Sequence, residues 1–131
     1  MTSDVAAVLR EHLTAIDHVG VAVADLDEAI TFYRETFGML AVHVEVNEEQ
    51  GVREAMVRAS SDDGTGTAVQ LLAPLRADST IGKFLTSKGP GLQQLAYRVS
   101  DIDTVTAALK EKGVRLLYPE AQRGTADSRV N

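Results

Sequence analysis

The fold is decided by residues 16–27, IDHVGVAVADLD, which read as a β-strand followed by the start of a helix. The side chains of a strand alternate between two faces. One face of this strand therefore holds the valines, whereas the other holds an imidazole and two small residues, namely His18, Gly20 and Ala22. The pattern predicts a strand with one apolar face and one nearly empty face, beginning at a histidine.

The pattern returns 76 residues later, where residues 94–103, QLAYRVSDID, align with residues 18–27, HVGVAVADLD. In both copies an apolar strand runs into the word Val-x-Asp-(Leu/Ile)-Asp and then into a helical segment. Internal repetition of a strand–helix unit indicates a duplicated architecture. We therefore expect the strands that begin near His18 and Gln94 to lie side by side.

The composition limits the classes of protein that the sequence fits. With 131 residues, 44% of them hydrophobic and 24% charged, the chain is long enough for one domain with a core. The net charge of −6 argues against a nucleic-acid partner, and no apolar run approaches the roughly 20 residues that cross a membrane. The absence of cysteine excludes disulfides and thiolate metal sites and favours a cytoplasmic location.

The first half of the chain reads as one βαβββ unit, preceded by a short helix over residues 4–13. Residues 25–37 have apolar side chains at helical spacing, with Asp25 three residues before Glu28 as an N-terminal cap and Gly38 as a stop. The strands of the unit are predicted over residues 16–23, 40–46, 53–59 and 67–73.

The second half repeats this order but is shorter. A connecting helix over residues 79–88 leads to a strand over 92–99, a helix over 101–112 that stops at Gly113, and a strand over 114–118. Residues 119–130 read as loop, with at most the start of a further strand at 129–130. The predicted fold is α+β, a single domain over 1–131 with one module over roughly 15–75 and a second over roughly 92–131 that lacks its last strands.

Four polar side chains stand out as candidate site residues. His18 lies beside the small residues of its strand face, and Gln94 is its equivalent in the repeat. A lone histidine at a strand start is more often a packed or surface residue. The prediction that His18 is a site residue therefore depends on its small neighbours. Gln70 is an amide within the apolar run AVQLLA, where an unpartnered amide would cost about 1–3 kcal/mol. Glu54 follows a polar turn, and composition alone favours an exposed carboxylate there.

Six words of the sequence carry a family resemblance. They are IDHVGVA at 16–22, NEEQGVREAM at 47–56, VQLLAPL at 69–75, DST at 78–80, AYRV at 96–99 and GVRLLY at 113–118. Together they resemble the vicinal oxygen chelate (glyoxalase-like) superfamily and, within it, the methylmalonyl-CoA epimerase family. The word that contains Glu54 is the most specific, because other members of the superfamily lack it. The resemblance implies two tandem βαβββ modules that form a cupped mixed sheet around a divalent metal.

By position, the resemblance implies that His18, Gln70 and Gln94 bind the metal and that Glu54 is one of two acid/base carboxylates. The family usually has two histidines where this chain has two glutamines, so the third ligand is an amide oxygen, a weaker donor than imidazole. Cobalt is the first expectation for the metal, with manganese or zinc as alternatives. The family continues with a strand whose glutamate is the fourth ligand and second base. The sequence ends at Asn131 without it, so we expect a truncated chain.

The implied reaction is the epimerisation of (2R)- and (2S)-methylmalonyl-CoA in propionate metabolism, with the acyl-CoA as small-molecule partner and a homodimer as the assembly. Removal of the C2 proton gives an enolate, which a divalent cation stabilises as a Lewis acid. Two other interpretations stay open: another metalloenzyme of the superfamily, such as a glyoxalase-like enzyme, and a metal-free ligand-binding protein of the same fold. A ring-cleaving iron dioxygenase is disfavoured, because His18 is the only histidine in the candidate set.

Overall fold

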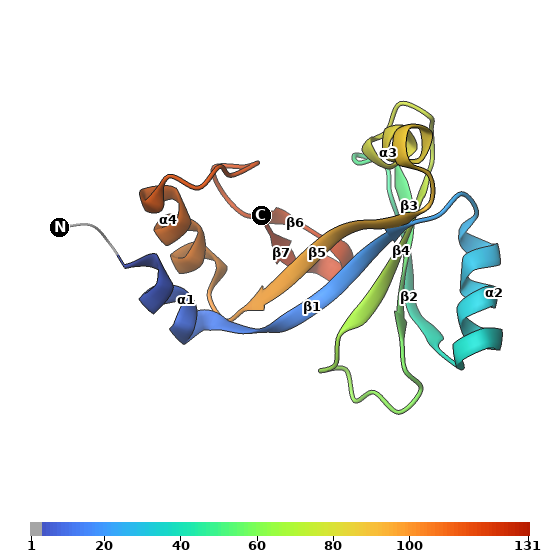
Figure 1. The fold of residues 1–131 in the computed structure, drawn as a ribbon, viewed down its shortest axis with the longest axis horizontal. Coiled ribbons are helices and arrows are strands. Elements are labelled where there is room, and N and C mark those ends of the chain that lie inside the picture. Colours follow the sequence, from blue (N-terminus) through green and yellow to red (C-terminus); the bar gives the residue numbers. More distant parts are fainter. Residues whose placement is uncertain (1–3) are drawn as a thin grey trace. The chain divides into compact units, whose positions relative to one another are not determined.

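Residues 4–131 are described by the structure, a computed structural model of the chain (Figure 1). They form two compact units: residues 16–96 make up one, and residues 97–131 with the segment before residue 16 make up the other. None of the helices described within 4–131 is both long and apolar enough to span a membrane. The elements in chain order are α1 (Val5–His12), β1 (Leu13–Ala22), α2 (Leu26–Phe37), β2 (Leu40–Asn47), β3 (Val52–Arg58), β4 (Ala68–Pro74), α3 (Thr80–Lys88), β5 (Gly91–Val99), α4 (Ile102–Lys112), β6 (Gln122–Arg123), the 3-10 turn η1 (Thr125–Asp127) and β7 (Arg129–Val130).

A five-stranded mixed sheet in the order β2-β3-β4-β1-β5 is the framework of the unit of residues 16–96. The strands β2, β3 and β4 pair antiparallel in sequence order, and β4 pairs in parallel with β1, where Gly20 lies opposite Gln70. The predicted α+β class with a mixed sheet is confirmed. The strand β5 lies next to β1, as the sequence repeat predicts. The boundaries of the two modules stay a prediction.

Each copy of the repeated word contains an aspartate that caps the N-terminus of a helix. The carboxylate of Asp25 accepts a hydrogen bond from the backbone N–H of Glu28 at 3.0 Å, and α2 ends at Gly38 in the left-handed conformation with a φ of 68°. In the second copy, the carboxylate of Asp101 accepts from the backbone N–H of Thr104 at 3.1 Å, and α4 also ends at a left-handed glycine. Such a cap typically stabilises its helix by about 1 kcal/mol. The two predicted helices are therefore confirmed together with the residues that begin and end them.

The main hydrophobic core lies between α2 and one face of the sheet (Figure 1). Val57 of β3 and Leu71 of β4 are completely buried there. Burial of one such side chain stabilises the fold by about 1.5–3 kcal/mol. The other buried members are Leu26, Ala55 and Ala73, and the residues packed against them are Val21, Val23, Ala29, Ile30, Tyr33, Met39 and Val69. The valine face of β1 is thus its core face.

The opposite face of the sheet is covered at one end by α3. The cap of this helix is Ser79, whose hydroxyl oxygen accepts a hydrogen bond from the backbone N–H of Gly82 at 3.0 Å. The apolar cluster beneath α3 consists of Ala22, Val52, Leu72 and Ile81, with Phe84 and Leu85 packed against it. The same sheet face holds the polar residues of β3 and β4 that form the candidate site.

In the other unit, α1 packs against α4. The backbone N–H of Ser100 donates to the backbone oxygen of His12 at 2.8 Å, and the Ser100 hydroxyl lies 2.8 Å from Nδ1 of the same histidine. The guanidinium of Arg129 binds both carboxylate oxygens of Asp103, at 2.9 and 3.0 Å. This bidentate pair joins β7 to the first turn of α4.

The prediction of a strand over residues 114–118 is wrong. After α4 ends, the N–H of Val114 donates back to the backbone oxygen of Leu109 at 3.0 Å, and the amide of Asn131 pairs with the backbone of Tyr118. A strand needs a neighbour for its backbone N–H and C=O groups, and none of the strands found within 4–131 pairs with this segment. The strand expected at 129–130 is confirmed as β7, but its partner β6 has no signal in the sequence.

Candidate functional site

Two neighbouring strands, β3 and β4, place a carboxylate and an amide on the sheet face opposite α2. In their antiparallel register Glu54 lies opposite Leu72 and Met56 lies opposite Gln70, so Glu54 and Gln70 are diagonal neighbours. Alternation along both strands turns these two side chains to the same face. Each of them is only 5% exposed. The strand period thus holds two polar side chains inside the protein.

A chain of hydrogen bonds joins three of the four predicted site residues. Gln94 on β5 donates from Nε2 to Oε1 of Gln70 at 2.8 Å. Gln70 in turn donates from Nε2 to Oε2 of Glu54 at 3.1 Å. A hydrogen bond to an ionised group contributes about 1.5–3 kcal/mol, more than one between neutral groups. The prediction that Gln70 needs a partner is confirmed, and its partners are side chains.

Composition alone favours an exposed carboxylate at position 54, and this prediction is wrong. Glu54 is buried, whereas Glu48 and Glu49 in the preceding turn are exposed. A carboxylate removed from water needs hydrogen-bond donors in place of its hydration, and the amide of Gln70 supplies one. Such a buried and hydrogen-bonded carboxylate has the surroundings of a general base.

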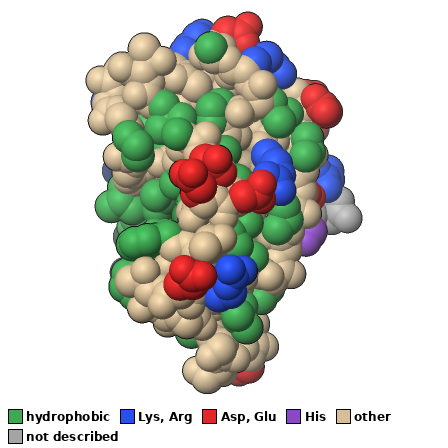
Figure 2. All heavy atoms as spheres, turned by 90° about the vertical axis from the view of Figure 1, so that its right-hand side faces the viewer, with side chains coloured by type: hydrophobic (Ala, Val, Ile, Leu, Met, Phe, Trp, Pro, Cys, Tyr) green, Lys and Arg blue, Asp and Glu red, His purple; other side chains and the backbone are tan. Residues whose placement is uncertain are grey.

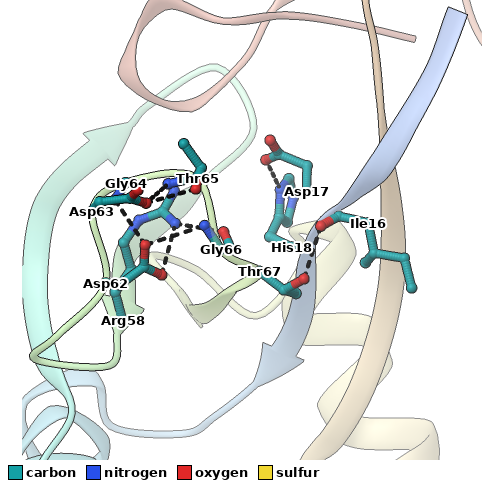
Figure 3. A network of polar contacts seen from close by, with 10 residues as sticks. All are labelled: Ile16, Asp17, His18, Arg58, Asp62, Asp63, Gly64, Thr65, Gly66 and Thr67. Carbon is teal, nitrogen blue, oxygen red and sulfur yellow. Dashed lines mark hydrogen bonds and ion pairs between the residues drawn. The ribbon is translucent and has the colours of Figure 1, made fainter.

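His18 lies two residues before Gly20 on β1 and therefore on the same face of that strand. Its side chain is 12% exposed, and Nδ1 lies 2.8 Å from Oδ2 of Asp17 (Figure 3). In the tautomer whose Nδ1–H donates a hydrogen bond to this carboxylate, Nε2 of the neutral ring carries the free lone pair. A carboxylate behind the ring is also the arrangement that orients metal-binding histidines. Sequence reasoning gave Asp17 no role, because a neighbour in a strand ordinarily points to the other face.

The loop between β3 and β4 lies beside β1 at Ile16 (Figure 3). The hydroxyl of Thr67 donates to the backbone oxygen of Ile16 at 2.9 Å. Within the loop, Oδ1 of Asp62 accepts from the N–H groups of two glycines, at 2.7 and 3.1 Å, and Oδ2 lies 3.5 Å from a guanidinium nitrogen of Arg58. The hydrogen bonds from the two backbone N–H groups, followed by the charge of Arg58, lower the pKa of Asp62.

This loop predicts how stability changes in acid. Because the pKa of Asp62 is lower in the folded protein than the ordinary 3.8, its ionised form stabilises the fold above that pH, and the contribution is lost as the pH falls through the folded value. Asp62→Asn should therefore melt below the wild type at neutral pH, with the difference shrinking below pH 3.8. Thermal melts over a pH series measure this. Glu35→Gln, at an exposed carboxylate of α2, is the control, and a difference independent of pH would contradict the prediction.

The space that the sequence leaves next to His18 is filled. A Cβ atom placed on Gly20 would lie 2.4 Å from Cγ of Gln94, so the Gln94 side chain occupies this position. Ala22 is completely buried in the cluster that contains Ile81 of α3. The prediction of a nearly empty strand face is therefore wrong at Gly20 and Ala22. They instead allow neighbouring elements to approach β1 closely.

The predicted ligand set offers one imidazole nitrogen and two amide oxygens, with a carboxylate beside one of the amides. Among the side chains that the structure describes, no group of three or more histidine, aspartate or glutamate side chains is placed to hold a metal ion. A site that used His18, Gln70 and Gln94 would thus be of the mixed kind that suits a divalent ion accepting both oxygen and imidazole ligands. By the chemistry of their donor atoms, these residues fit such an ion.

Comparison with known proteins identifies relatives along almost the whole chain. Residues 17–131 match the family model described as Glyoxalase/Bleomycin resistance protein/Dioxygenase superfamily. The crystal structure of methylmalonyl-CoA epimerase from Mycobacterium tuberculosis is similar, with 51% identity and a TM-score of 0.83, over 89% of this chain and 76% of that chain. A variant of the Streptomyces coelicolor methylmalonyl-CoA epimerase, in complex with 2-nitronate-propionyl-CoA, has 49% identity and a TM-score of 0.83, over 89% and 82% of the two chains.

A further relative is the mitochondrial methylmalonyl-CoA epimerase of Mus musculus, which is 35% identical over 113 residues. That match covers 86% of this chain but 61% of the mouse protein, so this chain spans less than two thirds of that relative's length. All four candidate site residues lie within the segment that the family model matches.

Proposed function

Because the chain belongs to the Glyoxalase/Bleomycin resistance protein/Dioxygenase superfamily and, within it, to the methylmalonyl-CoA epimerases, we propose that it interconverts the (2R) and (2S) epimers of methylmalonyl-CoA. This reaction is an isomerisation of a CoA thioester. The observation that carries the proposal is the buried Glu54 carboxylate, which accepts a hydrogen bond from Gln70 at 3.1 Å. A carboxylate in these surroundings suits proton abstraction from carbon.

The substrate supplies an acidic C–H bond, because C2 lies between a thioester and a carboxylate. Glu54 takes the C2 proton, and the electron pair of the broken bond moves into an enolate whose charge lies on the thioester oxygen. A proton returned to the opposite face of C2 gives the other epimer. No oxidation takes place, and the proton count is unchanged. Glu54 serves one face of C2, so the second face needs a second proton donor.

We further propose that Nε2 of His18 and the amide oxygens of Gln70 and Gln94 hold a divalent metal ion, with cobalt as the first candidate and manganese or zinc as alternatives. When bound, the ion would supply Lewis-acid stabilisation to the substrate oxygens. The support from this chain is the contact of His18 with Asp17 at 2.8 Å, which fixes the ring and directs Nε2 away from its carboxylate partner. The chain of hydrogen bonds from Gln94 through Gln70 gathers the amides next to Glu54.

A homodimer and a cytoplasmic location are part of the proposal. The strand β2 is an edge of the sheet, and its apolar side chains at Val42, Val44 and Val46 are exposed. Figure 2 shows hydrophobic side chains at the surface on the side of the molecule that carries α2. An open edge with apolar side chains favours contact with a second chain. The absence of cysteine supports a reducing compartment.

The activity is tested by incubating the protein with one epimer of methylmalonyl-CoA in heavy water, in the presence of cobalt, manganese or zinc. We expect the other epimer to appear with deuterium at C2. A glyoxalase-like enzyme would leave C2 unlabelled and act on a different substrate. A metal-free binding protein would bind the acyl-CoA without exchange. If C2 stays unlabelled with all three metals, the proposal is contradicted.

A further inference from the structure

The side chain of Gln94 leaves no room for a Cβ atom at Gly20. The φ angle of Gly20 is not in the left-handed region that favours glycine, so an alanine would be allowed by the backbone. The conflict comes from a side chain of another strand. A Cβ atom at position 20 would lie 2.4 Å from Cγ of Gln94, 2.9 Å from Nε2 and 3.0 Å from Cδ. The first two distances are too short for non-bonded atoms and the third is tight, so an alanine would displace Gln94.

The position of Gln94 over Gly20 matters because of what Gln94 reaches. Gly20 lies opposite Gln70 in the parallel register of β1 and β4. By crossing β1 at the one residue without a side chain, Gln94 brings Nε2 to 2.8 Å from Oε1 of Gln70. The three nearest atoms that oppose a Cβ at position 20 all belong to this one side chain. The missing side chain and the hydrogen bond are therefore two parts of one arrangement.

The hydrogen bond from Gln94 selects one orientation of the Gln70 amide. A glutamine amide has a donor end and an acceptor end that exchange places when the group rotates by half a turn. With Oε1 accepting from Gln94, Nε2 of Gln70 is turned toward Glu54, to which it donates at 3.1 Å. In the opposite orientation an amide oxygen would face the carboxylate, and the two acceptors would repel each other. Gln94 thus favours the orientation in which Gln70 holds Glu54.

We propose that Gly20 is a positioning residue for the Glu54 base: by lacking a side chain it admits Gln94 across β1, and Gln94 orients the Gln70 amide that holds the carboxylate. The inference rests on the proposed function for the role of Glu54 as base. Gly20 and Gln94 then act as a unit. A methyl group added at position 20 and removal of the Gln94 amide both break the hydrogen bond from Gln94 to Gln70. Once one change has broken this bond, the other change should have no further effect.

A double-mutant cycle tests this unit. Gly20→Ala and Gln94→Ala should each lower kcat by about 10- to 100-fold, the range of losses for residues that orient an active group, with a smaller effect on KM. The double variant should be no slower than either single one, because Gln94→Ala removes the three atoms that lie nearest to a Cβ at position 20. Gln50→Ala, at an exposed turn glutamine, is the matched control and should keep full activity. Multiplying losses in the double variant would overturn the proposal.

A second measurement does not depend on activity. The side-chain amide protons of Gln70, followed by NMR, should shift and exchange faster with solvent in the same way in Gly20→Ala and in Gln94→Ala. If the Gln70 signals are unchanged in folded Gln94→Ala, the amide chain has no orienting role and the proposal fails. If those signals change but the wild type leaves C2 unlabelled, the amide chain stands and the proposed function fails. Should Gly20→Ala not fold alone, Gln94→Ala and the double variant still decide the question.

Discussion

Replacement of Glu54 by glutamine will lower the rate of epimerisation by about 10²- to 10⁴-fold, the usual loss when a general base is removed. Glutamine keeps the shape of the side chain and an oxygen that accepts from Gln70, so the fold should survive. The loss should fall on kcat, since the acyl-CoA does not need the carboxylate in order to bind. Interconversion of the epimers in heavy water measures it.

Deuterium labelling makes the test of Glu54 sharper. Because each face of C2 needs its own base, Glu54→Gln made in a chain that also carries the second carboxylate should still exchange the C2 proton of one epimer while it fails to convert that epimer into the other. Glu49→Gln, at an exposed glutamate of the turn before β3, is the matched control and should be fully active. Epimerisation by Glu54→Gln near the wild-type rate would remove Glu54 from the mechanism.

Replacement of His18 by alanine should abolish tight binding of cobalt. Loss of a hydrogen-bonded neighbour of a ligand costs about 10–100-fold in metal affinity, and loss of the only imidazole among the proposed ligands should cost more. Calorimetric titration with cobalt measures the affinity without reference to turnover. His12→Ala is the control, because His12 lies in α1 and pairs with Ser100. Equal cobalt affinity in wild type and His18→Ala would show that the ligand assignment is wrong.

The same titration tests the third proposed ligand from the other direction. Gln94→His exchanges an amide oxygen for an imidazole nitrogen, which is the stronger donor for cobalt or zinc. We expect this variant to bind cobalt more tightly than the wild type. Weaker binding by Gln94→His would indicate that the amide acts only as the hydrogen-bond donor seen in contact with Gln70.

The start of both helices could be predicted at the repeated word Val-x-Asp-(Leu/Ile)-Asp, with Asp25 as the cap of the first, because capping is a local interaction. Strand pairing is not local, so the predictions of which segments form strands are less accurate. Strands were predicted over 53–59 and 67–73, and the observed strands at 52–58 and 68–74 have neighbours on both sides in the sheet. Residues 114–118 are as apolar as a strand requires, but the backbone of Tyr118 pairs with the side chain of Asn131. A pattern of side chains predicts what a strand would bury, but not whether a partner is present.

The candidate site shows the same limit. Gln70 was recognisable because an amide in an apolar run must find a partner. Glu54 was not recognisable as buried from composition, since its burial depends on the register that sets it diagonal to Gln70. The position of Gln94 over Gly20 depends on β5 lying next to β1. A single sequence indicates that Gly20 is small, but it does not show which side chain takes the space.

The alternation of β3 and β4 also limits how this protein can change during evolution. Gln70 lies between two residues of the α2 core, Val69 and Leu71, and Glu54 is followed directly by another, Ala55. Deletion or insertion of one residue in either strand would exchange the two faces, bringing polar groups into the core and apolar groups into the site. Point substitutions can therefore alter the chemistry and the core separately, but changes of length are confined to the turns and to the loop between the strands. Insertions within this part of the sheet must therefore fall there.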